Sequence, residues 1–271
     1  MSDRIKVAVA GVNGKMGRAS VQMILEDQEL ELVGAFGRAG AGYAGKSMIA
    51  GFSGGGSTAV MVSNGIEDCF ATNKPDVLLD FTIAEPAVEH AKYSIERGVR
   101  PILGVSGVDP SDVEILSNLA KAKGVGAMVV PNFSIGAVLM MEFARQAGKH
   151  FNNVEIVEMH GTKKLDAPSG TAMYTTRKLA ENSKAYNPKE VKDRELLNGA
   201  RGGVTEQGVR VHSIRLPGLI SHQDVIFGSE GELLCIRHES FNTNCFIKGI
   251  ILSIKSVTKM SSLVVGLEHL L

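Results

Sequence analysis

A short glycine-rich run near the start of the chain constrains the fold more than any other feature. Gly11, Gly14 and Gly17 follow the apolar, strand-like segment Lys6–Ala10, and a helix-like segment begins at Lys15. In this context one glycine permits the tight turn, one lets the backbone approach a pyrophosphate, and one allows close helix–strand packing. The helix start adds free amide groups for an anion. The run predicts a dinucleotide-binding unit, with a glycine turn that binds nothing as the alternative.

Apolar runs alternate with amphipathic stretches through the first half of the chain, which favours an α/β protein with parallel strands and crossover helices. The expected strands are Lys6–Ala10, Glu31–Phe36, Asp76–Phe81, Pro101–Val105 and Gly126–Val130. The expected helices are Lys15–Leu25, Pro86–Arg97 and Ser111–Lys123. We therefore predict a doubly wound, Rossmann-like parallel sheet.

A different pattern begins at about Asn132 and predicts a smaller α+β domain with a mixed open sheet. Its expected helices are Ile135–Lys149 and a second one from Gly170. Its expected strands are Val154–Met159, Gly208–Leu216, His222–Phe227 and Glu232–His238. The apolar helix Phe246–Val257 is expected to return to the first domain. The predicted domains are therefore 1–131 plus 242–271, and 132–241.

Composition and charge exclude several classes of protein. Lys plus Arg and Asp plus Glu both number 29, so no long-range field attracts nucleic acid or an anionic membrane. No window approaches the roughly 18 apolar residues of a membrane span. Because Met1–Arg4 leads into a strand without a secretory signal, we expect a cytoplasmic protein. The three cysteines lack metal-ligand spacing, which predicts reduced, mostly core thiols and no metal site.

Residues Gly37 to Gly56 include eight glycines and few apolar anchors. Such a composition predicts a mobile surface loop, with a lid over a bound cofactor as the alternative.

The residues after the second expected strand indicate which dinucleotide is bound. An acidic residue at this position would accept hydrogen bonds from the ribose 2′-hydroxyl, but Gly37 and Arg38 follow Phe36 here. The Arg38 guanidinium, with Lys15 as a second cation, suits a 2′-phosphate. We therefore predict that NADPH is preferred over NADH, with a solvated surface Arg38 as the alternative.

Later strands end in small or polar residues that are expected at the same edge of the sheet. Phe81 and Thr82 follow one strand, and Gly104, Val105, Ser106 and Gly107 end the next. These positions line the crevice at the carboxyl edge of an open parallel sheet, which predicts contact with the nicotinamide side of the cofactor. An ordinary strand-to-helix turn is the alternative.

The segment from Glu158 to Ala172 combines a strand end, a polar loop and a helix start. The amides and hydroxyls of Ser169, Gly170 and Thr171 are expected to bind a carboxylate, and Lys164 adds positive charge. His160 has an unperturbed pKa near neutrality, which suits it to donate or relay a proton as a hydride arrives. A structural histidine at a strand end is the alternative.

These segments together resemble the 4-hydroxy-tetrahydrodipicolinate reductases, also called dihydrodipicolinate reductases. The resemblance is carried by Gly11–Arg18, Asp80–Thr82, Pro131–Gly136 and, most specifically, Glu158–Ala172, and it is weaker around 202–204 and 238–249. It implies that NAD(P)H reduces a cyclic, dicarboxylated, imine-type substrate to tetrahydrodipicolinate in lysine and diaminopimelate biosynthesis. It also implies a homotetramer joined through the sheets of the second domains, which would bind substrate.

The resemblance also implies the roles of individual residues. His160 matches the family's acid, Lys164 its catalytic and substrate-binding lysine, and Ser169, Gly170 and Thr171 its carboxylate binders. Gly104 and Gly107 match the ends of the family's nicotinamide-side glycine motif. With the positions argued above, we predict cofactor contacts at Gly11, Asn13, Gly14, Lys15, Met16, Gly17, Arg38, Phe81, Thr82, Gly104, Val105, Ser106, Gly107, Pro131, Asn132 and Phe133.

Three positions depart from the family's pattern. Gly161 stands where a second histidine is usual, Val105 and Ser106 replace two threonines, and Thr243 stands where an arginine is frequent. Each lost charged or hydrogen-bonded contact would weaken binding by about 1.5–3 kcal/mol. Two other functions therefore stay open: a non-catalytic NADP-binding regulatory or sensor protein, and a dehydrogenase for another small amino or keto dicarboxylate.

Overall fold

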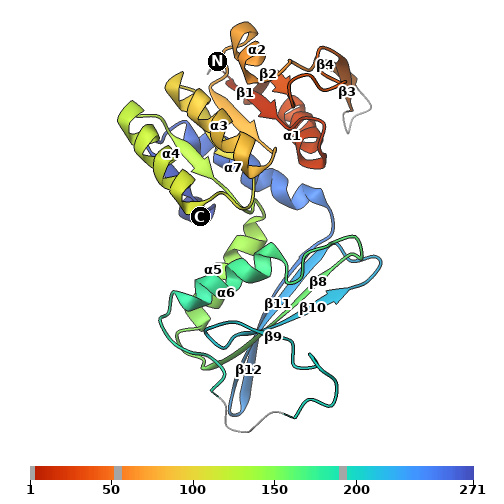
Figure 1. The fold of residues 1–271 in the computed structure, drawn as a ribbon, viewed down its shortest axis with the longest axis vertical. Coiled ribbons are helices and arrows are strands. Elements are labelled where there is room, and N and C mark those ends of the chain that lie inside the picture. Colours follow the sequence, from red (N-terminus) through yellow and green to blue (C-terminus); the bar gives the residue numbers. More distant parts are fainter. Residues whose placement is uncertain (1–3, 52–56, 189–193) are drawn as a thin grey trace. The chain divides into compact units, whose positions relative to one another are not determined.

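The computed structural model describes residues 4–51, 57–188 and 194–271 (Figure 1). The chain forms two compact units, one made of Met1–Phe133 and Phe246–Leu271 and the other of Ser134–Cys245. We call them unit 1 and unit 2. Within the described ranges, none of the helices has the length and apolar character that crossing a membrane requires.

Unit 1 contains a parallel sheet in the order β13-β7-β6-β5-β1-β2. Its strands are β1 (Ile5–Ala10), β2 (Leu30–Phe36), β5 (Val77–Asp80), β6 (Arg100–Leu103), β7 (Ala127–Val129) and β13 (Leu263–Val265). The strand order reverses between β1 and β5, which is where open α/β sheets bind ligands. The prediction of a doubly wound sheet is confirmed. Strand β13 was not among the expected strands.

Helices cover both faces of this sheet. They are α1 (Lys15–Glu26), α2 (Ile66–Thr72), α3 (Ala84–Glu96), α4 (Pro110–Lys123) and α7 (Ile247–Val257), and a short 3₁₀ turn, η2, spans Glu268–Leu270. Helices α1 and α7 contact each other, and α3 contacts α4. Residues Val7 to Ala10 of β1 are completely buried, because a central parallel strand covered on both faces must be apolar throughout.

The segment after β2 is more ordered than the predicted loop. Strand β3 (Ser47–Gly51) pairs with β4 (Ser57–Met61) in an antiparallel ribbon. The prediction of a loop from Gly37 to Gly56 is therefore wrong for Ser47–Gly51. The turn before β3 is held by main-chain hydrogen bonds between Gly45 and Val62 and between Val62 and Lys46. Residues 52–56 lie outside the described residues. Pairing with β4 was missed because it depends on residues beyond the glycine-rich run.

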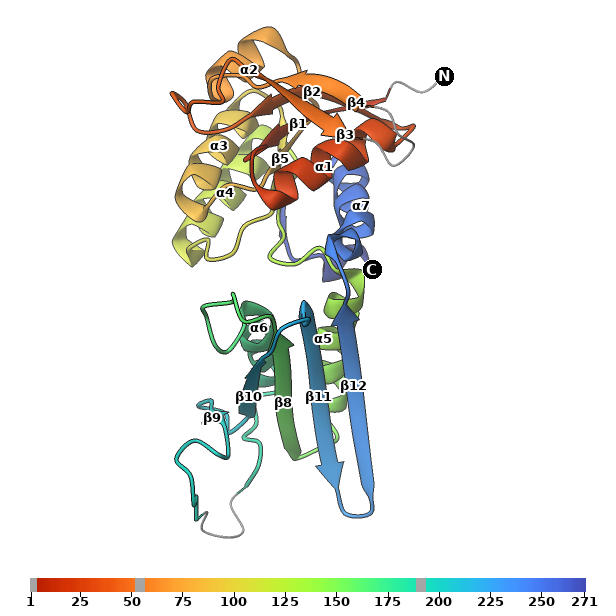
Figure 2. The same cartoon turned by 90° about the vertical axis from the view of Figure 1, so that its right-hand side faces the viewer.

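Unit 2 contains a mixed sheet in the order β12-β11-β8-β10-β9 (Figure 2). Its strands are β8 (Asn153–His160), β9 (Gly203–Val204), β10 (Arg210–Arg215), β11 (Ser221–Ser229) and β12 (Glu232–Ser240). Strands β8 and β10 are parallel and the other pairs antiparallel, as predicted for a mixed sheet. Its helices are α5 (Ile135–Ala147) and α6 (Gly170–Ala180), and the 3₁₀ turn η1 (Thr243–Phe246) follows β12.

The two helices of unit 2 lie on one face of its sheet. On that face β8 and β11 contribute Val154, Ile156, Val225 and Phe227, which are at most 1% exposed. Alternate residues of a strand point to opposite faces, so Glu155, Val157 and Met159 of β8 point away from the helices. We call this second surface the open face of unit 2.

The cysteines differ from the expectation of mostly core thiols. Cys69 is buried, whereas Cys235 is exposed and Cys245 is intermediate. Burial raises the pKa of the Cys69 thiol to about 11, which keeps it protonated. In the described part of the chain, no three His, Cys, Asp or Glu side chains gather as ligands for a metal ion.

Candidate active site

The glycine turn of unit 1 packs directly against the end of β5. Gly11 has φ +71°, and a Cβ atom there would lie 2.6 Å from the carbonyl oxygen of Phe81. A Cβ at Gly17 would lie 2.3 Å from the Gly11 carbonyl oxygen. Gly14 caps the start of α1 without a side-chain hydrogen bond. The turn therefore requires glycine at positions 11 and 17, and it leaves amide groups at the helix start for a ligand.

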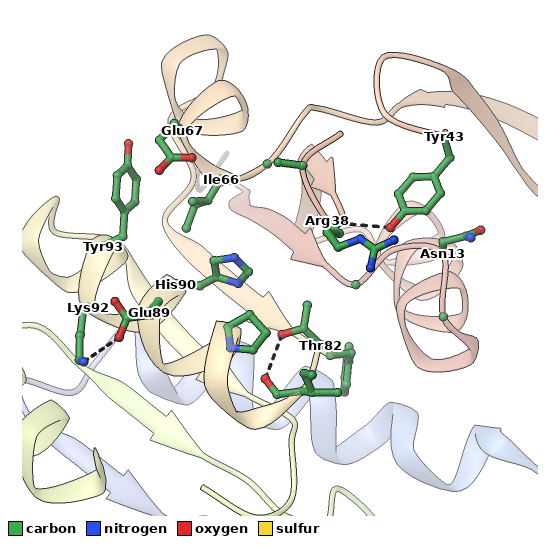
Figure 3. A pocket seen from close by; sticks show the side chains of 18 of the residues that line it. Asn13, Arg38, Tyr43, Ile66, Glu67, Thr82, Glu89, His90, Lys92 and Tyr93 are labelled. Atoms are coloured by element: carbon green, nitrogen blue, oxygen red, sulfur yellow. Dashed lines mark hydrogen bonds and ion pairs between the residues drawn. The ribbon is translucent and has the colours of Figure 1, made fainter. Parts of the chain in front are cut away.

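A cavity of about 890 Å³ opens beside this turn (Figure 3). The structure brings six of the predicted cofactor residues to its wall: Gly11, Asn13, Gly14, Arg38, Phe81 and Thr82. The same wall includes α2 and α3 residues, among them Ile66, His90 and Tyr93. Its position at the carboxyl ends of β1, β2 and β5 suits a dinucleotide. Lys15 and Met16 begin α1 nearby without lining this cavity.

Tyr43 lies beside Arg38 and was not predicted from the sequence. The Arg38 amide donates to the Tyr43 hydroxyl at 3.2 Å, and the ring closely approaches Gly37. Figure 3 shows Arg38, Tyr43 and Asn13 together. A second cavity of about 410 Å³ shares Asn13 and Tyr43, and its described lining includes two further cations, Arg18 and Lys46, and no carboxylate. Three cations, Arg38, Arg18 and Lys46, thus lie around Tyr43 and Asn13, while Glu67, Glu89 and Glu96 line the larger cavity.

His90 is a second residue of this cavity that no sequence pattern predicted. Its Nδ1 atom lies 2.7 Å from Oδ2 of Asp80, which is completely buried. The other oxygen of Asp80 accepts from the main chain of Thr82 at 2.8 Å. Asp80 ends β5, and His90 lies ten residues later on α3. The two side chains meet because α3 packs back beside the end of β5.

The other predicted nicotinamide-side residues occupy the ends of β6 and β7. A Cβ at Gly104 would lie 2.4 Å from the Phe81 ring, so glycine is needed for the contact of Phe81 with Phe133. Val105 is 5% exposed and belongs to the core under α3 and α4. The valine side chain, at a position where the family usually has threonine, therefore packs in the core. The main chain of Val105 is the part that can face a cofactor. Ser106, Gly107 and Pro131 are exposed, and Asn132 is half-buried.

Glu158 is the centre of the polar cluster in unit 2. Its side chain has no exposed surface, and Oε2 lies 2.6 Å from Nδ1 of His160. Residues two apart on a strand point to the same face, which explains this contact. Arg215, opposite His160 on β10, donates to both oxygens of Glu158 at 2.8 and 3.0 Å.

Arg215 also reaches the loop after β8. Its Nη2 atom donates to the main-chain oxygen of Asp166 at 2.8 Å. The Asp166 carboxylate accepts from Nζ of Lys164 at 2.8 and 2.9 Å. The structure therefore connects His160 and Lys164 through Glu158, Arg215 and Asp166. None of these three connecting residues was assigned a role from the sequence.

The start of α6 belongs to the same cluster. The Ser169 amide donates to Oε1 of Glu158 at 3.2 Å, and its hydroxyl oxygen accepts from the Ala172 amide at 3.1 Å. The hydroxyl proton of Ser169 is consequently its donor for another group. Gly170 is exposed, with open space where a Cβ would stand. The first turn of a helix has amides without intrahelical partners, which suit a carboxylate.

Burial and hydrogen bonding set the charges of this cluster. Burial alone would raise the pKa of Glu158, but hydrogen bonds from Arg215, Ser213 and His160 outweigh it and hold the pKa below its usual value. Burial lowers the pKa of His160, and Glu158 offsets this only in part. Glu158 is therefore ionised at neutral pH. The neutral form of His160 carries its proton on Nδ1, where Glu158 accepts it.

The loop before β11 lies close to Gly161. A Cβ at Gly161 would lie 2.9 Å from the main-chain oxygen of Leu219, and the Leu216 amide donates to the His160 carbonyl at 3.1 Å. A histidine at position 161 would require this loop to shift. Thr243 begins η1, after the last strand of unit 2.

Comparison with known proteins identifies the family. Residues 5–133 and 136–271 match the two family descriptions "Dihydrodipicolinate reductase, N-terminus" and "Dihydrodipicolinate reductase, C-terminus". The 4-hydroxy-tetrahydrodipicolinate reductase of Geobacillus kaustophilus is 43% identical over 98% of this chain and 99% of its own length. The enzyme of that name from Bacillus subtilis is 40% identical over 100% and 99%.

A solved structure supports the same assignment. The dipicolinate-bound dihydrodipicolinate reductase of Paenisporosarcina sp. TG-14 is 39% identical, covers 99% of this chain and 100% of its own, and has a TM-score of 0.87. Sequence and fold agree over both units. The chain therefore belongs to the dihydrodipicolinate reductase family.

Proposed function

We propose that this chain reduces 4-hydroxy-tetrahydrodipicolinate (dihydrodipicolinate) to tetrahydrodipicolinate with NAD(P)H, in lysine and diaminopimelate biosynthesis. The observation that carries the proposal is the cluster of unit 2. There His160 and the start of α6 contact Glu158 directly, and Lys164 is linked to it through Asp166 and Arg215. A titratable imidazole, a cation and helix amides suit a small dicarboxylate that accepts a proton. The family supports the reaction, and a relative of known structure binds dipicolinate.

The residues of unit 2 take complementary roles in this proposal. Lys164 and the amides of Gly170 and Thr171 hold the substrate carboxylates, and the Ser169 hydroxyl donates a further hydrogen bond. His160 delivers the proton through Nε2, because Nδ1 is held by Glu158. The reduced nicotinamide supplies the hydride when it is bound. His160 and Lys164 are the proposed catalytic residues.

The proposed cofactor site is the cavity of unit 1. Gly11, Asn13, Gly14 and the start of α1 would bind the pyrophosphate, with Lys15, Met16 and Gly17 shaping the helix start. Phe81 and Thr82 would line the cleft. The nicotinamide side would be formed by the main chain of Gly104, Val105, Ser106 and Gly107 and by Pro131, Asn132 and Phe133.

A direct assay tests the reaction. NADPH absorbance is followed while the substrate is generated enzymatically, with another small keto dicarboxylate in a parallel reaction. The proposal expects turnover that depends on the generated substrate. Bound NADPH without turnover would favour the sensor alternative. Turnover with the second dicarboxylate alone would favour the other dehydrogenase.

We propose further that NADPH is preferred over NADH. Arg38 lines the cavity beside Asn13 and Tyr43, and β2 ends without a carboxylate that would repel a 2′-phosphate. Arg38→Ala should raise the KM for NADPH about 10- to 150-fold, as expected for one charge-assisted hydrogen-bonding group, with little effect on NADH. Arg4→Ala is the control, because Arg4 pairs with Glu31 at the opposite end of β1. Equal effects on both cofactors would contradict the preference.

The proposed assembly is a homotetramer joined through the open faces of unit 2. That face exposes Ile214, Cys235 and Leu233, and Leu233 is 78% exposed. Sedimentation should show a tetramer for the wild type and smaller species for Leu233→Lys. Leu197→Lys, an exposed position outside the sheet, should leave the mass unchanged. The protein is proposed to be cytoplasmic, where its three free cysteines stay reduced.

A further inference from the structure

The buried carboxylate of Glu158 connects three elements that the proposed reaction uses. It contacts the histidine of its own strand, the arginine of β10 and the first residue before α6. A carboxylate without exposed surface needs several donors, and Glu158 has them in Arg215, Ser213, His160 and the Ser169 amide. The contacts therefore form one hydrogen-bond network, so that a substitution of Glu158 alters a contact in β8, in β10 and at the start of α6.

We propose that Glu158 and Arg215 are positioning residues of the reductase. Glu158 fixes the ring of His160 and assigns its proton to Nδ1, which leaves Nε2 for the exchange with substrate. Arg215 neutralises Glu158 and holds the Asp166 carbonyl, so that the loop with Lys164 keeps its place. The inference deepens the proposed function and rests on it.

The geometry separates the tasks of the two residues. Glu158 touches His160 at 2.6 Å, whereas Arg215 reaches both Glu158 and the main chain of Asp166. The loss of the Glu158 charge should therefore change proton transfer. The loss of the bidentate Arg215 contact should change the loop and the binding of substrate.

The charge of Glu158 should be visible in the pH profile. The charged groups near His160 are Glu158 on β8, Arg215 on β10 and Lys164 in the loop, while Ser221 of β11 lies opposite and is uncharged. A carboxylate favours the protonated imidazole, so Glu158→Gln should lower the pKa of His160. If protonated His160 is the donor, the decline of kcat/KM with rising pH should begin about one pH unit or more lower.

The main experiment compares two variants under the assay of the proposed function. Glu158→Gln should lower kcat about 10²–10⁴-fold, the range of general acid–base catalysis, and should move the alkaline decline. Arg215→Lys keeps the positive charge but not the paired hydrogen bonds. It should raise the KM for substrate about tenfold or more. The fall of kcat/KM at alkaline pH should stay closer to the pH seen in the wild type than it does in Glu158→Gln.

Glu155→Gln is the matched control. Glu155 lies on the same strand and also contacts a histidine and an arginine, but on the open face. It should keep the kcat and the pH profile of the wild type. Turnover by the wild type and by this control tests the proposed function separately from the positioning roles.

A double variant keeps the test valid if single variants do not fold. Glu158→Gln with Arg215→Met removes both charges, so no unpaired charge stays buried. It should fold, with a lower kcat and an earlier alkaline decline. A folded Glu158→Gln variant with kcat within threefold of the wild type and an unmoved decline would overturn the role of Glu158. An equal shift of the decline in Arg215→Lys would overturn the division of tasks.

Discussion

Two similar sets of polar groups are centred on glutamates that lie on opposite faces of strand β8. The covered-face set is Glu158, His160 and Arg215, and the open-face set is Glu155, His212 and Arg201. The carboxylate–histidine distances are almost equal, 2.6 Å for Glu158 and 2.7 Å for Glu155. The two glutamates differ in burial, because the side chain of Glu158 has no exposed surface and that of Glu155 is 35% exposed.

Burial decides what such a set can do. A partly exposed carboxylate can exchange its protein partners for water, so its contacts contribute little and hold their geometry weakly. A buried carboxylate has no such exchange and must keep its donors. Residue identity and distance therefore do not separate a proton-transfer group from a surface ion pair here. The helices that cover one face of β8 separate them.

The largest expected difference between the two sets is in catalysis. His160→Ala should lower kcat about 10²–10⁴-fold with a much smaller change in NADPH affinity, because it removes the proposed proton donor. His212→Ala should stay within about twofold of the wild type. Steady-state kinetics with NADPH titrations measures both variants. Similar losses in the two variants would remove the functional distinction between the faces.

The second difference is in stability. Glu158→Ala leaves Arg215, whose side chain is 19% exposed, without its carboxylate partner. Breaking a buried pair in this way should reduce the free energy of unfolding by about 3–5 kcal/mol. Glu155→Ala should cost about 1 kcal/mol or less. Urea unfolding of both variants at one protein concentration makes the comparison, and equal losses would show that the burial difference has no energetic consequence.

The sequence allowed prediction of the features that depend on neighbouring residues. The glycine turn and the strand ends could be assigned because each is a local pattern whose geometry is set within a few residues. His160 and Lys164 were identified within one polar segment. Strand β13 was missed because Leu263–Val265 is short and becomes a strand only by pairing with β7.

The residues that support the site were harder to predict. Glu158 had a usable signal, since it precedes His160 by two residues on a strand and must share its face. Arg215 had none, because its position opposite His160 depends on the parallel register of β10 and β8. Tyr43 and His90 likewise reach the cavity of unit 1 only through tertiary packing. The sequence therefore indicated the proposed reacting groups better than the residues that hold them in position.

Acid should affect the buried set in a defined direction. The folded protein holds the pKa of Glu158 below its unfolded value of about 4.3, so below that pH the unfolded chain binds more protons. The stability that Glu158 contributes is complete above about pH 4.3 and is lost as the pH falls through the folded pKa. Between pH 5 and 3, the free energy of unfolding should fall less steeply for Glu158→Gln than for the wild type. The two slopes should differ by up to about 1.4 kcal/mol per pH unit. Parallel curves from urea unfolding would contradict this linkage.

The smallest expected effect is the coupling between Glu155 and Arg201 on the open face. These side chains are 35% and 48% exposed and lie 2.9 Å apart. A double-mutant cycle with Glu155→Gln and Arg201→Gln should give a coupling of about 0.2–1 kcal/mol at low salt. The coupling should weaken as the ionic strength rises toward 1 M, where the screening length is about 3 Å.

The salt dependence sharpens the comparison because it tests screening directly. A cycle with Glu158→Gln and Arg215→Met should give a larger coupling that changes less with salt, since water and ions do not reach Glu158. Both cycles use urea unfolding at the same protein concentration and two salt concentrations. A Glu155–Arg201 coupling above about 2 kcal/mol, or one unaffected by salt, would mean that this pair is shielded from solvent. The pair would then lie inside the proposed tetramer contact, whereas the expected weak, salt-sensitive coupling places it at the solvent-exposed margin of that contact.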